Sequence, residues 1–219
     1  MPVHFHLFGG SYYDRRINLG NLGRPAHTTH LDPHAAHMRK KLIDYLYKVA
    51  TGSKKVRNLL TPVGAIFFAC FITLFVLLAL QLDQLLTLPR FIPSPFNLIL
   101  SLPILFPGLS LIGWSALHFL KMKGTPVPFN PPPKLVVDGP YAYVRNPMLS
   151  GVFISLFGFG LLIGSFSFTF ILTPLFIALN VWELKAIEEP ELAKRLGEEY
   201  LEYKNKTPMF IPNYRQKEK

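Results

Sequence analysis

Three long stretches of the chain contain no Asp, Glu, Lys or Arg: residues 58–82, 91–120 and 146–182. A helix needs about 20 mostly apolar residues to cross the hydrocarbon core of a bilayer, which is roughly 30 Å thick. The first two stretches therefore predict one membrane-spanning helix each, over about residues 63–82 and 97–120. A helix in a soluble protein would keep a polar face, and residues 65–80 have none.

The third stretch is too long for a single crossing, because at 1.5 Å per residue it would form a helix of about 55 Å. Gly164 and Ser165 lie near its middle and predict a tight turn between two helices, over residues 148–163 and 166–182. The expected fold class is all-α. It is an integral membrane helical bundle of about four transmembrane helices, with cytosolic interfacial helices and a Pro-rich cytosolic loop.

The basic residues predict the orientation of this bundle. The chain has 23 Lys and Arg against 13 Asp and Glu, a formal net charge of +10. Basic residues concentrate in cytosolic segments of membrane proteins. If both termini and loop 121–145 are cytosolic, every Lys and Arg except Arg90 lies on that side. We expect an integral protein of the cell (inner) membrane whose positive charge faces anionic headgroups, and no nucleic-acid partner.

The region before the first span, residues 1–62, is expected to be a basic, His-rich cytosolic leader, and residues 63–219 the membrane domain. Residues 38–57 of the leader predict an amphipathic interfacial helix. The histidine spacing matches no metal-binding motif, so no metal site is expected. The single cysteine, Cys70, excludes an intramolecular disulfide and a zinc site built on cysteine pairs.

Two segments expected to be cytosolic have features that most membrane proteins lack. Loop 121–145 contains six prolines, which fix φ and suppress helix, and a long loop without regular structure is often functional. After the last span, Leu192, Leu196, Tyr200 and Tyr203 recur at three- and four-residue spacing and predict one amphipathic helix.

These segments read GPYAYVRNPMLSG and, beyond the helical hairpin, EEPELAKRLGEEYLEYKNKTPMFIP. In this order they resemble the C-terminal half of the isoprenylcysteine carboxyl methyltransferase family, part of a wider group that includes phospholipid N-methyltransferases. The resemblance covers about residues 124–212. It implies methyl transfer from S-adenosyl-L-methionine to a lipid-like or prenylated small-molecule acceptor at the cytosolic membrane face. It leaves the oligomeric state open.

The resemblance also implies which residues form the site. Its cofactor-binding residues are Lys134, Leu135, Val136, Tyr141, Arg145, Asn146, Pro147, Met148, Leu149, Glu188 and Glu189. Arg145, Glu188 and Glu189 are the candidate catalytic residues. A glutamate suits the ammonium or ribose hydroxyls of the cofactor, and the planar fork of an arginine suits its carboxylate.

Two positions depart from the family pattern and bear on the acceptor. Asn146 stands where many members have histidine, and asparagine cannot hold a charge. Leu184, with Lys185 beside it, stands where the carboxyl methyltransferases have an arginine facing the substrate. Isoprenylcysteine-type carboxyl O-methylation is the favoured function. A phosphatidylethanolamine-type N-methyltransferase and a small hydrophobic acceptor remain alternatives.

A non-enzymatic membrane protein or small transporter is the alternative from a different class. Transporters usually place polar groups near the middle of the membrane. Here the charged motifs lie at one face, which favours an enzyme.

Overall fold

The computed structural model describes residues 33–122, 132 and 134–212 of the chain. The chain divides into two compact units, Met1–His37 and Met38–Lys219. The description below concerns the second unit, apart from helix α1, which begins in the first. The histidines at positions 27 and 30, and residues 123–131 and 133 of loop 121–145, lie outside the described residues.

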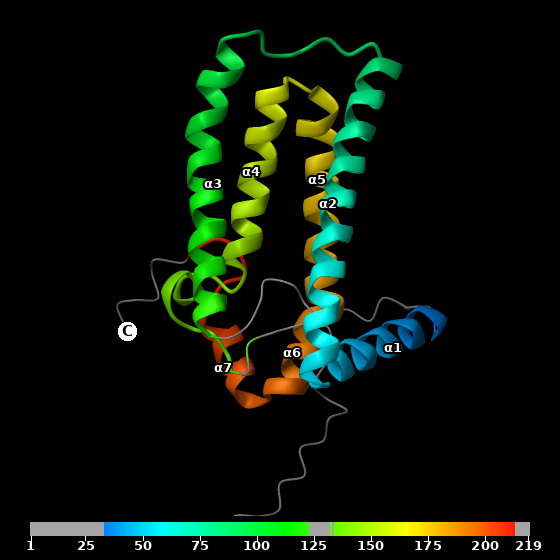
Figure 1. Ribbon diagram of the computed structural model, residues 1–219, viewed down its shortest axis with the longest axis vertical. Helices are drawn as coiled ribbons and strands as arrows, with labels where there is room; N and C mark the ends of the chain where they lie inside the picture. The colour runs from blue at the N-terminus through cyan, green and yellow to red at the C-terminus, as the bar shows by residue number, and fades with distance from the viewer. Residues whose placement is uncertain (1–32, 123–131, 133, 213–219) are drawn as a thin grey trace, which may run out of the picture. The chain divides into compact units, whose positions relative to one another are not determined.

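Regular structure in the described residues is entirely helical, with no strand, which confirms the all-α prediction. The α-helices in Figure 1 are α1 (Pro33–Ala50), α2 (Lys54–Leu85), α3 (Phe96–Lys121), α4 (Pro147–Ile163), α5 (Thr173–Glu183), α6 (Glu189–Leu196) and α7 (Glu198–Lys206). Three short helical segments complete the description: the 3-10 helix η2 (Gly139–Ala142) and the π-helices η3 (Phe168–Leu172) and η4 (Leu184–Glu188).

The long apolar helices confirm the predicted membrane bundle. Pro62–Leu85, Phe96–Lys121 and Phe168–Leu196 are each long and apolar enough to span a bilayer, and Pro147–Ile163 is a shorter apolar helix. Large apolar side chains on the outer faces of α2 and α3 are exposed, among them Phe67 (72%) and Phe106 (76%). Such exposure fits contact with lipid.

The last apolar segment continues well beyond residue 182, where the sequence predicts its end. Helical structure runs from Phe168 to Leu196 through η3, α5, η4 and α6. At 1.5 Å per residue this segment is roughly 40 Å long, more than the hydrocarbon core needs. The hairpin therefore delivers the acidic residues after Trp182 to the end of the bundle without a break.

Small residues bring α3 and α4 into close contact. A Cβ atom on Gly151 would lie 2.7 Å from the carbonyl oxygen of Gly108, and one on Gly158 would lie 2.7 Å from Cγ of Leu105. Such approach requires glycine and is a usual basis of helix association in membranes. Gly160 packs instead against Phe168 and Thr169 of η3. The α3–α4 contact involves other glycines.

The predicted turn at Gly164 and Ser165 is confirmed. Gly164 ends α4 with φ of 68°, a left-handed conformation that glycine adopts readily. Asp83 of α2 accepts hydrogen bonds from the Ser165 hydroxyl and, at 2.8 Å, from the backbone N–H of Ser167. The α2–α3 connection and the α4–α5 turn thus lie at the same end of the bundle, as Figure 1 shows.

Two predicted helices have different bounds in the structure. The interfacial helix expected over residues 38–57 ends at Ala50, because Thr51 and Gly52 form a turn before α2 begins at Lys54. The helix expected across residues 192–203 is interrupted at Gly197, where φ is +62°. This glycine separates α6 from α7.

Candidate functional site

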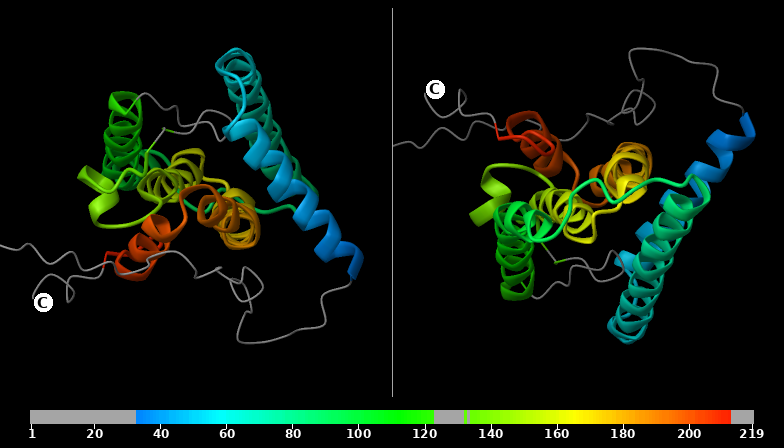
Figure 2. Two further views of the ribbon diagram at one scale, coloured as in Figure 1. Left: turned by 90° about the horizontal axis from the view of Figure 1, so that it is seen from below. Right: turned by 90° about the horizontal axis from the view of Figure 1, so that it is seen from above.

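The site forms at the end of the bundle opposite the Gly164 turn, where α6 and α7 lie near the start of α4 (Figures 1 and 2). The chain enters it through η2. Gly139 begins this turn with φ of +57°, and a Cβ atom there would collide with the His118 ring. Only glycine therefore allows η2 to pass so close to the end of α3.

The start of α4 is joined to the segment after α7. The backbone N–H groups of Arg145 and Asn146 donate to the carbonyl oxygens of Pro208, at 2.8 Å, and Met209, at 3.1 Å. Pro147 occupies the first turn of α4, where its missing N–H costs no helical hydrogen bond. These contacts fix the Arg145 backbone against the C-terminal segment.

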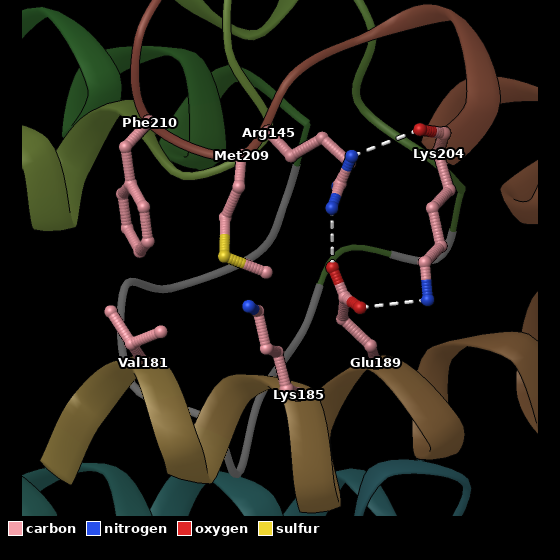
Figure 3. A pocket seen from close by; sticks show the side chains of 7 residues that line it. All are labelled: Arg145, Val181, Lys185, Glu189, Lys204, Met209 and Phe210. Carbon is pink, nitrogen blue, oxygen red and sulfur yellow. Dashed lines mark hydrogen bonds and ion pairs between the residues drawn. The ribbon is translucent and has the colours of Figure 1, made fainter. Parts of the chain in front are cut away.

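The side chain of Arg145 completes the connection. Its Nη2 contacts Glu189 Oε1 at 2.6 Å, and its Nη1 donates to the carbonyl oxygens of Lys204, at 2.9 Å, and Thr207. Glu189 Oε2 in turn accepts from Lys204 Nζ at 2.8 Å. Figure 3 shows this network. One carboxylate thus bridges two cations, and the exposed fractions of the Arg145 and Glu189 side chains are only 11% and 6%.

Three tyrosines come from the segments that flank this network: Tyr141 from η2, and Tyr200 and Tyr203 from α7. The Tyr203 hydroxyl donates to the carbonyl oxygen of Tyr141 at 2.7 Å, and the Tyr141 ring packs against Phe119. Burial raises the pKa of Tyr141, Tyr200 and Tyr203 well above that of a free phenol. These phenols are therefore neutral, and that of Tyr203 donates a hydrogen bond.

A pocket of about 520 Å³ opens beside the network. Its lining residues, all labelled in Figure 3, are Arg145, Val181, Lys185, Glu189, Lys204, Met209 and Phe210. Charged groups lie toward one side of the close-up, and Val181 and Phe210 lie toward the other. The pocket therefore offers a polar end and an apolar end.

The π-helix η4 explains why three lining residues share one face. The lining includes three residues spaced four apart, Val181, Lys185 and Glu189. An α-helix has 3.6 residues per turn, so residues four apart would shift gradually to another face of a regular α-helix. A π segment has a wider turn with i→i+5 hydrogen bonds and is frequent at functional sites. η4 occupies residues 184–188 and keeps this row directed at the pocket.

The structure brings together two of the predicted site residues, since Arg145 and Glu189 form an ion pair and both line the pocket. The others do not line it: Lys134, Leu135, Val136, Tyr141, Asn146, Pro147, Met148, Leu149 and Glu188. Within that group Val136, Tyr141 and Pro147 are buried and Lys134 is exposed. Most of the predicted residues thus do not line this pocket.

Sequence reasoning missed five lining residues: Val181, Lys185, Lys204, Met209 and Phe210. The row of residues four apart leading to Glu189 was a usable signal for the first two. Leu184, which the resemblance aligns with a substrate-facing arginine, is 1% exposed and does not line the pocket. The adjacent Lys185 does.

Comparison with known proteins gives two matches. Residues 97–199 match the sequence model of the phospholipid methyltransferase family. Over 82 residues the chain is 38% identical to the protein-S-isoprenylcysteine O-methyltransferase of Schizosaccharomyces pombe. That match covers 36% of this chain and 33% of the relative, so the shared region is about a third of the relative's length. No solved structure matches the chain.

Proposed function

We propose that this chain is a membrane enzyme that transfers a methyl group from S-adenosyl-L-methionine to a lipid-like acceptor. The match of residues 97–199 to the phospholipid methyltransferase family model supports this proposal. The observation that carries the proposal is the Arg145–Glu189–Lys204 network beside a pocket with a polar and an apolar end. The favoured reaction is carboxyl O-methylation of an isoprenylcysteine-type acid.

The residues around the network fit the cofactor chemically. Arg145 Nε is buried and has no hydrogen-bond partner among the described residues. This N–H group would donate to the cofactor carboxylate. Glu188 makes no ion pair within the described part of the chain, so its carboxylate would accept from the ammonium or ribose hydroxyls. The bound cofactor would supply an activated methyl group.

The contribution of the protein to such a transfer is alignment. Holding two reactants in line lowers a barrier by up to about 7–11 kcal/mol in favourable cases. Arg145 is fixed through both its backbone and its side chain. We infer that it and Glu189 hold the pocket wall rigid while a polar cofactor enters from water and an apolar acceptor enters from the bilayer.

Phospholipid amine N-methylation is a second candidate, and the family's own description favours it. For either reaction we propose the inner cell membrane as the location, with both termini and loop 121–145 cytosolic. All but one of the Lys and Arg residues then face the cytosol.

Calorimetry with S-adenosylhomocysteine, the product form of the cofactor, tests the proposal on the purified full chain in detergent. We expect the native protein to bind, and Arg145→Ala and Glu188→Ala to bind roughly tenfold more weakly or worse. Removing one partner of a charge-assisted contact typically costs about 1.5–3 kcal/mol.

The control is Lys206→Ala, because the Lys206–Glu202 pair is exposed and neither residue lines the pocket. Undiminished affinity in both site variants would remove Arg145 and Glu188 from the cofactor site.

A further inference from the structure

The pocket lining carries more positive than negative charge. It includes three basic side chains, Arg145, Lys185 and Lys204, and one acidic side chain, Glu189. Both carboxylate oxygens of Glu189 are already engaged, one by Arg145 and one by Lys204. A ligand of this pocket therefore meets an excess of positive charge.

Lys185 is the basic lining residue that this network leaves unused. It makes no hydrogen bond and no ion pair with any described residue, in contrast to Arg145 and Lys204. Its side chain is exposed, and Figure 3 shows its ammonium group directed into the pocket toward Met209. An ammonium group in this position attracts an oxyanion.

The position of Lys185 between the two ends of the pocket selects the shape of the ligand. Val181, one turn earlier on the same face, and Phe210 form the apolar end, and the Arg145–Glu189 pair forms the other end. A molecule with an anionic head and an apolar body would place the head at Lys185 and the body along Val181 and Phe210. Lysine acts as a point charge, and its ammonium group donates to a carboxylate or a phosphate oxygen equally well.

The cofactor itself is a poorer partner for Lys185. It carries an ammonium and a sulfonium against one carboxylate, so its net charge is positive, and like charges repel. The orphaned Nε of Arg145 already offers a donor for that carboxylate. The lysine is therefore free to serve the second reactant.

We propose that Lys185 is a specificity-determining residue that binds the anionic head of the methyl acceptor, so that the acceptor is an acidic amphiphile. This inference rests on the proposed function, and it assigns to Lys185 the task that the resemblance gives to position 184. The head is a carboxylate or a phosphate oxygen, which are the same chemistry to an ammonium group.

Binding of three probes to the full chain in detergent, with S-adenosylhomocysteine present, tests this assignment. The probes are N-acetyl-S-farnesylcysteine, its neutral methyl ester, and dodecyl phosphate. We expect the native protein to bind the acid, the phosphate or both at least tenfold more tightly than the ester. Lys185→Gln should abolish that preference, and Lys185→Arg should keep most of it. Each probe partitions into the detergent micelles to the same extent whichever variant is present. Differences in affinity between variants therefore do not come from this partition.

Lys194→Gln is the matched control, because it removes the same charge from α6 outside the pocket, where Lys194 pairs with Asp44. It should keep the preference for the anionic probes. The stronger of the two anionic probes identifies the head as carboxylate or phosphate. An equal affinity of the native protein for acid, phosphate and ester, or a preference that survives Lys185→Gln, would overturn the inference.

The same samples distinguish a failure of the Lys185 inference from a failure of the proposed function. Lys185→Gln should bind S-adenosylhomocysteine within about twofold of the native protein if Lys185 serves only the acceptor, whereas a tenfold loss would assign Lys185 to the cofactor and overturn the inference. Absence of S-adenosylhomocysteine binding by the native protein would instead overturn the proposed function.

Discussion

Glu189 shows at the scale of a single residue how the site is held together. Its carboxylate is 6% exposed and accepts from Arg145 of one segment and Lys204 of another. Removing one partner of a buried ion pair strongly destabilises the folded protein, because the remaining buried charge is left without compensation. We expect Glu189→Gln to lower the free energy of unfolding in detergent by about 3 kcal/mol, measured by denaturant titration, and to weaken cofactor-product binding.

The matched control is Glu202→Gln on α7. Its pair with Lys206 is 70–76% exposed, and an exposed pair contributes at most about 1 kcal/mol. Similar decreases in the free energy of unfolding of the two variants would mean that the Glu189 bridge stabilises the protein no more than an exposed ion pair does.

At the scale of the helices, contact between α3 and α4 depends on glycine. A Cβ atom on Gly151 would lie 2.7 Å from the Gly108 carbonyl oxygen, a backbone atom that cannot move aside cheaply. We expect Gly151→Ala to lower the free energy of unfolding by about 1–3 kcal/mol through overpacking, as thermal unfolding in detergent would show.

For Gly113 of α3 we expect the opposite effect of an alanine substitution on the free energy of unfolding. Nothing lies within 4 Å of a Cβ atom built there, so Gly113→Ala gains helix propensity of up to about 1 kcal/mol. Equal responses of the two variants would contradict the close helix contact.

The helical elements also show how far sequence alone reaches. Long apolar stretches and a Gly-Ser turn are local signals, and they correctly placed α3, α4 and the hairpin turn. The predicted end of the last span was wrong because the π-helix η4 continues the helix from Glu183 to Glu189 without interruption. A periodicity of 3.6 likewise missed the break at Gly197, since one residue with positive φ is enough to separate α6 from α7.

The candidate site was less predictable, for a physical reason. Arg145 and Glu189 are separated by 44 residues and meet only because the hairpin folds back. Met209 and Phe210 reach the pocket through backbone hydrogen bonds and ring packing, such as Phe153 against Phe210, that no local pattern encodes. The resemblance named Arg145 and Glu189 as separate cofactor contacts, whereas the structure showed their ion pair and the pocket residues opposite it.

For the whole molecule, the basic residues and the fold make a joint prediction about topology. The α2–α3 connection and the α4–α5 turn lie at one end and include Arg90, and α7 lies at the other end. In a Cys70→Ser background, an impermeant maleimide applied to intact cells should label Ser94→Cys and not Asn205→Cys. Permeabilised cells give the control, in which both positions should react. Labelling of Asn205→Cys from outside would reverse the orientation.

Methyl transfer by the purified full chain is the most direct test of the central claim. The protein would be incubated with S-adenosyl-L-methionine labelled in its methyl group and, separately, with N-acetyl-S-farnesylcysteine, phosphatidylethanolamine and a total membrane lipid extract. We expect label in at least one lipid-phase product, most of it lost in Arg145→Ala, and base-labile if the product is a methyl ester. Native protein that binds S-adenosylhomocysteine yet transfers no label to any of the three would contradict the claim.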